Sequence, residues 1–126
     1  MGYTHYWNNE KFTKKQWLEV IERGKKILSC ATVIPLQFDY DDPKPVELSK
    51  DCIRFNGVEE DGHETFLVDP FKTDFEFCKT ALKPYDTVVV AFLIMLNDVN
   101  PEFEWSSDGD DEDHEQGRKL YEESRQ

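Results

Sequence analysis

Cysteine, basic side chains and long apolar runs are all scarce in this sequence. The three cysteines, Cys30, Cys52 and Cys78, are odd in number and far apart, which fits reduced thiols and matches no zinc spacing. The longest apolar run, residues 88–96, is about half as long as a bilayer span. The first residues show neither the basic nor the apolar region of a signal peptide. We therefore expect a cytoplasmic protein with no disulfide framework, structural metal or transmembrane segment.

Well-specified enzyme motifs are also missing. The sequence contains no nucleophile elbow, P-loop, glycine-rich dinucleotide fingerprint or helix with two metal-binding histidines. Cys78 with His5, or Glu64 with His63, would supply a nucleophile or an acid–base pair if the fold brought them together. Catalysis is therefore possible, but no motif supports it, and the sequence indicates no cofactor.

The charge balance is strongly acidic and uneven along the chain. Against 15 Lys and Arg there are 27 Asp and Glu, which gives a net charge of -12. Residues 1–29 carry six basic and three acidic side chains, whereas residues 101–126 carry three basic and ten acidic ones. An acidic surface repels phosphate backbones and anionic membranes, so direct binding to either is disfavoured unless basic residues gather in one pocket.

The chain has enough apolar residues for one modest core. Its 126 residues include 38% hydrophobic and 13% aromatic side chains, too many for a disordered tail. The one Pro- and Asp-rich loop, residues 39–45, separates two segments of the same domain. We therefore expect a single domain over residues 1–126.

Three helices are predicted from capping and periodicity. Thr13 and Gln16 form a capping box for a helix that ends near Leu28, and Phe12 is placed to pack on Trp17. Residues 87–96 are predicted as a buried central helix with Asp86 as its N-cap. The third helix covers residues 111–124, with acidic residues in its first turn.

Five strands are predicted beside these helices. They cover residues 3–7, 52–56, 64–68, 75–79 and 103–106. Turn residues at 56–57, 61–62 and 69–70 indicate antiparallel connections, so the middle three strands are expected to form a meander. The fold class is therefore α+β: an antiparallel sheet of about five strands with three helices, one of them buried.

The first candidate group of site residues is aromatic and lies on the first predicted strand. Alternation places Tyr3, His5 and Trp7 on one face of that strand. Such side chains stack on a base or sugar and donate hydrogen bonds at the rim of a pocket. The alternative is that the aromatic rings of this strand simply fill the core.

The second candidate group surrounds a predicted turn. If Ile53 and Phe55 face the core, Arg54 and Asn56 share the opposite face, with Glu64 on the paired strand nearby. These groups would hold a phosphate and hydroxyls of a ligand. The alternative is a tight turn with a surface Arg–Glu pair of little energetic value.

The third and fourth candidate groups flank the last two helices. Lys79 and Thr80 are placed to donate to an anion near a helix start, and Tyr85 to close over a ring; the alternative is a strand-to-helix corner capped by Asp86. Asp108 follows the last predicted strand and is placed to reach a pocket. Its neighbours are acidic, but Gly109 is misplaced for a calcium-binding EF-hand loop, so a solvated turn is the alternative.

Several of these segments together are similar to a known group of proteins. The shared pattern consists of residues 2–7 (Gly-Tyr-Thr-His-Tyr-Trp), 55–57, 64–66, 77–81, 83–86 and 106–110. It spans nearly the whole chain and resembles a family of small, mostly uncharacterised proteins from bacteriophages, some bacteria and fungi. The chain departs from the pattern at Asp113-His114, where an aromatic residue is expected after the Asp-rich turn. The resemblance implies a phage-type origin and, with it, the cytoplasm of a host cell.

The leading functional hypothesis is a small binding protein. Aromatic, cationic and amide side chains at strand ends suit a small polar, nucleotide-derived ligand, which a phage protein would sequester to counter host defence. One alternative is an acidic inhibitor that imitates nucleic acid and binds a host protein, as the charge of residues 101–126 suggests. Another is a small hydrolase acting on a nucleotide-like substrate through His5, Glu64 or Cys78. The sequence does not indicate an oligomeric state.

Overall fold

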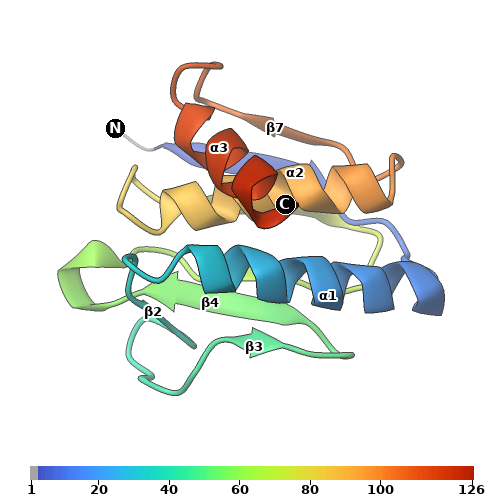
Figure 1. The fold of residues 1–126 in the computed structure, drawn as a ribbon, viewed down its shortest axis with the longest axis horizontal. Helices are drawn as coiled ribbons and strands as arrows, with labels where there is room; N and C mark the ends of the chain where they lie inside the picture. Colours follow the sequence, from blue (N-terminus) through green and yellow to red (C-terminus); the bar gives the residue numbers. More distant parts are fainter. Residues whose placement is uncertain (1–2) are drawn as a thin grey trace.

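The fold is described for residues 3–126 of a computed structural model, so Gly2 of the N-terminal motif lies outside the described residues (Figure 1). Its elements are β1 (Thr4–Asn8), α1 (Lys14–Cys30), β2 (Leu36–Gln37), β3 (Glu47–Leu48), β4 (Ile53–Gly57), the 3₁₀ turn η1 (Glu59–Asp61), β5 (Phe66–Val68), β6 (Phe75–Lys79), α2 (Asp86–Val99), β7 (Trp105–Ser107) and α3 (Glu115–Ser124). The predicted α+β class, with antiparallel strands and three helices, is confirmed.

The strands divide between two sheets, where the sequence suggested one. One sheet has the strand order β6-β1-β7, and the other has the order β2-β4-β3 with β5 also paired to β4. In Figure 1, β7 lies at the top of the view and β3 at the bottom, with the three helices between them.

The predicted meander of three consecutive strands is wrong at its last step. β4 and β5 are antiparallel neighbours, but β6 leaves them and pairs with β1, with Tyr6 opposite Phe77. The cause lies in the loop before β6, which hydrogen-bonds to the chain after β1: Phe12 N donates to Pro70 O (3.1 Å) and Asn9 N to Asp74 O (2.8 Å). A turn signal predicts that the chain reverses, but it does not say which strand receives the next one.

The first helix begins as the sequence predicts. Thr13 and Gln16 form the reciprocal capping box, and the rings of Phe12 and Trp17 are 5.2 Å apart. The buried stripe continues over Val20 to Ile27. This stripe fixes α1 against the rest of the core, because apolar side chains at helical spacing share one face.

The second helix forms the centre of the core, as predicted. Nine of its residues are buried. Its Phe92 ring is 5.3 Å from Phe55 of β4, which is 5.2 Å from Phe66 of β5. Phe66 in turn is 5.4 Å from Trp7 of β1, so aromatic contacts join both sheets to α2. In the described part of the chain, no helix has the length and apolar character needed to span a membrane.

The third helix starts later than predicted. Residues 111–114 form a turn before the helix: Asp110 N donates to the Asp113 carboxylate and Asp113 N to the Asp110 carboxylate, both at 3.1 Å, and His114 N donates to Asp110 O over 3.2 Å. The helix begins at Glu115. This turn positions His114 beside β1.

Candidate functional site

Side chains from three distant segments meet where β1, the start of α2 and the turn before α3 come together. We name them the His5 cluster: Tyr3, His5, Thr80, Asp86 and His114. Three of the five were singled out as site residues by the sequence. The other two, Asp86 and His114, were not.

The centre of the cluster is a buried imidazole–carboxylate pair. His5 Nε2 lies 2.6 Å from Asp86 Oδ1, and the Thr80 hydroxyl donates to the same oxygen over 2.6 Å. His5 is fully buried and Asp86 is 5% exposed. Asp86 was predicted as a helix cap, but it is the first residue of α2 and its carboxylate turns away from the helix toward β1. The helix dipole still favours its negative charge there.

Three rings enclose the His5 imidazole. Tyr3 meets it edge-on with ring centres 5.2 Å apart, His114 lies 5.9 Å away and Trp105 lies 6.1 Å away. When the proton between His5 and Asp86 is on His5 Nε2, His5 Nδ1 has a free lone pair that faces these three rings. The arrangement matches that of a general base that a carboxylate orients.

The cluster contains most of the unmade hydrogen bonds of the described residues. Within residues 3–126, four buried side-chain polar atoms have no hydrogen-bond partner of normal geometry, and three of them are Tyr3 Oη, His5 Nδ1 and His114 Nε2. An unpaired buried polar atom costs about 1–3 kcal/mol. Native proteins pair almost all such groups, so three in one cluster point to a functional role.

The Tyr3 hydroxyl is held in its neutral form. Burial raises the pKa of Tyr3 to about 12. The Ser107 side chain, which reaches the hydroxyl without the geometry of a normal hydrogen bond, opposes the rise, and nearby carboxylates, Asp86 first among them, add to it. A Cβ at position 109 would lie 2.1 Å from Tyr3 Oη, so only glycine lets the loop approach the hydroxyl this closely. At neutral pH the hydroxyl is therefore a hydrogen-bond donor fixed against the turn.

His114 is also neutral near pH 7. Burial lowers its pKa below the usual 6.5, and the facing His5 adds to the lowering. A neutral imidazole has one donor and one acceptor nitrogen, so His114 Nε2 is able to match either kind of ligand atom.

Carboxylates dominate the charge around the cluster. Asp108 is used by the protein itself, because Thr4 N donates to its Oδ2 over 3.1 Å and the Tyr6 hydroxyl to its Oδ1 over 3.2 Å. Asp108 therefore fastens the end of β1, which corrects its interpretation as a free ligand-binding carboxylate. With Asp110 and Asp113 also nearby, the cluster suits hydroxyl and N–H groups better than a phosphate.

The candidates Glu64, Lys79 and Tyr85 lie beside the cluster and bind one another. Lys79 N donates to Glu64 Oε1 over 2.8 Å, and the Tyr85 hydroxyl donates to Glu64 O over 2.6 Å. Tyr85 is fully buried, so the prediction that it closes over a ligand ring is wrong. The Lys79 side chain is exposed and lies over the Phe77 ring, 5.9 Å from its centre.

Two further predictions fail through burial. Trp7 is 2% exposed and belongs to the core, with its Nε1 donating to Asn9 Oδ1 over 3.1 Å, so it is not available for stacking. Cys78 is buried, and desolvation raises its pKa to about 12, which leaves the thiol protonated and weakens it as a nucleophile.

Arg54 and Asn56 lie on the other sheet, in what we name the Asp39 network: Asp39, Arg54, Asn56 and Thr65. Glu64 does not lie with Arg54 as expected, and the alternative of a surface Arg–Glu pair is also wrong, because Arg54 forms its ion pair with Asp39 and stacks over Phe38 at 4.3 Å. Asn56 is fully buried and makes four hydrogen bonds around the loop before β5. These two residues therefore stabilise a loop and do not join the His5 cluster.

Asp86 and His114 are the site residues that sequence reasoning missed. In the sequence, a role as helix N-cap is a sufficient explanation for Asp86, and its partner His5 is 81 residues away. One feature of the sequence pointed to His114: it occupies the position where the family pattern has an aromatic residue. Both became visible only when the fold placed β1 against α2 and the turn before α3.

Among residues 3–126, His, Cys, Asp and Glu form no group of three or more arranged to hold a metal ion. No family model, curated protein or solved structure matches the chain. The resemblance to the phage-type family therefore stays a prediction.

Proposed function

We propose that the protein binds a small polar, nucleotide-derived ligand at the His5 cluster. The observation that supports this is the group of three buried polar atoms without a hydrogen-bond partner of normal geometry: Tyr3 Oη, His5 Nδ1 and His114 Nε2. One donor, one acceptor and one adaptable imidazole nitrogen complement the hydroxyls of a ribose or the edge of a base. A ligand that pairs them recovers the hydrogen bonds that the folded chain leaves unmade.

The acidic surroundings define which part of such a ligand fits. Asp86 and Asp110 raise the local negative potential, so the nucleoside end enters the cluster and a phosphate stays outside it. The three rings around His5 add apolar faces for a base or sugar. In a phage setting, stoichiometric capture of such a molecule would remove a host defence signal.

The experiment is calorimetric titration of the full chain with a panel of cyclic nucleotides and ADP-ribose derivatives. We expect one class to bind in a 1:1 ratio and Tyr3→Phe to weaken it at least about tenfold, a loss of about 1.4 kcal/mol. The matched control is Tyr6→Phe, which removes a hydroxyl three residues further along the chain, in β1, where it bonds Asp108.

Two results would count against the proposal. Absence of heat and of a thermal shift across the whole panel removes its main support. An equal loss of affinity in Tyr3→Phe and Tyr6→Phe would assign the effect to the end of β1 in general, and not to the His5 cluster.

A small hydrolase is the second candidate, because His5 and Asp86 have the geometry of an oriented general base. In that case His5 Nδ1 accepts a proton from the attacking water while Asp86 stabilises the imidazolium. The same titration separates the two candidates: a binder returns the ligand unchanged after denaturation, and a hydrolase returns product. An acidic inhibitor gains no support from Asp108, whose carboxylate oxygens bind the protein's own groups.

A further inference from the structure

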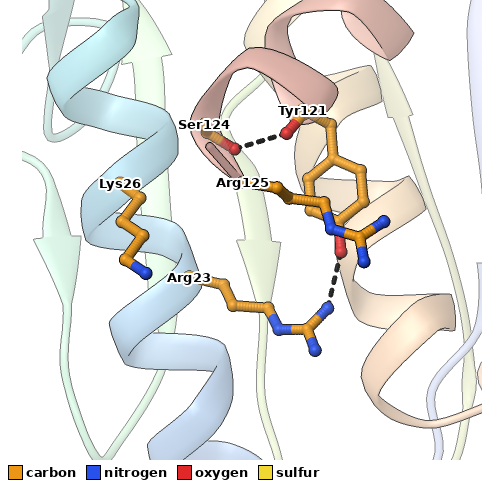
Figure 2. A pocket seen from close by; sticks show the side chains of 5 residues that line it. All are labelled: Arg23, Lys26, Tyr121, Ser124 and Arg125. Atoms are coloured by element: carbon orange, nitrogen blue, oxygen red, sulfur yellow. Dashed lines mark hydrogen bonds between the residues drawn. The ribbon is translucent and has the colours of Figure 1, made fainter.

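We propose a second binding site, for a phosphate-type anion, in the hollow between the C-terminal halves of α1 and α3. The hollow has a volume of about 190 Å³ and is lined by five side chains, shown in Figure 2: Arg23, Lys26, Tyr121, Ser124 and Arg125. Three of these five are cationic, in a chain whose net charge is -12. This site goes beyond the proposed function and shares no residue with the His5 cluster.

Two of the three cations of this site contact the same tyrosine. Arg23 Nη1 donates to Tyr121 Oη over 2.6 Å, and that hydroxyl donates to Asp98 over 2.6 Å. Arg125 lies over the Tyr121 ring at 5.5 Å. Figure 2 shows the Arg125 side chain across the Tyr121 ring and the Arg23 side chain pointing to the Tyr121 hydroxyl. Two guanidinium groups arranged in advance lose less conformational freedom when they bind an anion.

Positive charge at the hollow exceeds the negative charge that pairs with it. Arg23 contacts the carboxylates of Glu19 (2.6 Å) and Asp98 (3.1 Å), and Arg125 reaches the same Asp98 at 3.9 Å. Lys26 forms no ion pair with any of the described residues. Three cations thus share two carboxylates, which leaves a local excess that a small anion neutralises.

The size of the hollow selects a phosphate group in preference to a strand of nucleic acid. A volume of about 190 Å³ equals roughly six water molecules and is below the 300 Å³ typical of pockets that enclose a whole ligand. Guanidinium groups bind phosphate oxygens through paired N–H donors. The acidic surface outside the hollow repels a polyanion, so the site takes a single phosphate or the phosphate end of a small molecule.

The test is a titration of the full ¹⁵N-labelled chain with inorganic phosphate, at constant ionic strength set by chloride. We expect amide signals of residues 23–26 and 121–125 to shift, and Lys26→Gln to raise the dissociation constant at least about fivefold. The matched control is Lys25→Gln, which removes the same charge from the neighbouring position of α1, where the lysine pairs with Glu22 at 3.6 Å; we expect it to stay within about twofold of the wild type.

The outcomes separate this site from the proposed function. Tyr3→Phe should keep wild-type phosphate affinity, because the His5 cluster lies beside the start of α3 and not at its end. The proposal is overturned if phosphate shifts no signal of the two segments beyond what chloride does, or if the two lysine variants weaken binding equally. Lys25 and Lys26 are both exposed, so neither variant threatens the fold.

Discussion

The His5 cluster and the Asp39 network each join an Asp and a Thr to other polar side chains, but they differ in how completely their hydrogen bonds are made. In the Asp39 network, Asn56 donates to His63 O and Thr65 Oγ1 and accepts from the backbone of Gly57 and His63. In the His5 cluster, three buried polar atoms have no hydrogen-bond partner of normal geometry among the described residues, whereas the Asp39 network has one such atom, Arg54 Nε. The first network therefore serves stability, and the second keeps binding capacity.

The difference comes from what surrounds each group. The Asp39 network borders a loop, whose backbone amides and carbonyls supply partners at short range. In the His5 cluster, His5 and Thr80 both bond Asp86, but the His5 ring centre lies more than 5 Å from those of Tyr3 and His114, so the unpaired atoms of these rings do not reach one another. Aromatic rings pack favourably at centre-to-centre distances that are too long for hydrogen bonds between their polar atoms.

The largest expected effect is on stability, from Asn56→Ala. This change removes four hydrogen bonds from a fully buried position and leaves Gly57 N and His63 N without acceptors. We expect the free energy of unfolding in urea to fall by about 3 kcal/mol. Binding at the His5 cluster should be unchanged under conditions where the variant is folded; a loss of ligand affinity there would break the separation of the two regions.

A smaller, pH-dependent effect is expected from Asp39→Asn. Hydrogen bonds from Thr65 and Arg54 lower the pKa of Asp39 to about 2. Because the folded pKa is depressed, Asp39 contributes stability above the unfolded value of about 4, and that contribution is lost as the pH falls toward 2.

At pH 7 the Asp39→Asn variant should be less stable than the wild type by about 1 kcal/mol, allowing for solvent screening of a partly exposed group. Urea unfolding at pH 7 and pH 2 should show this difference shrink toward zero at low pH. The control is Asp41→Asn, an exposed aspartate on the same loop. A difference that persists at pH 2 would mean that the ionised carboxylate of Asp39 is not what stabilises the network.

Local features of the fold were predictable from the sequence because they depend on neighbours in the chain. The capping box of Thr13 and Gln16 and the antiparallel pairing of β4 with β5 both follow from residues a few positions apart. Pairing of β6 with β1 depends instead on loop contacts between segments 9–12 and 70–74. No turn signal encodes that choice of neighbour.

The candidate site was predictable only in part for the same reason. Tyr3, His5 and Thr80 were identified by their chemical type, and they do meet. Arg54 and Asn56 have equally suitable chemistry, yet the fold pairs them with Asp39 and the backbone of a loop. Residue type indicates what a side chain is able to bind, but only the fold decides whether other groups of the protein already bind that side chain.

The measurement that tests this account most directly is the free energy of unfolding of Tyr3→Phe, without ligand, against that of the wild type. The Tyr3 hydroxyl is buried and has no hydrogen-bond partner of normal geometry in the described chain, so removing it should leave stability within about 0.5 kcal/mol of the wild type or raise it. The Asn56→Ala variant measured beside it supplies the contrasting loss. A loss above about 1 kcal/mol in Tyr3→Phe would mean that the fold already pairs this hydroxyl, and it would contradict the claim that the His5 cluster keeps it for a ligand.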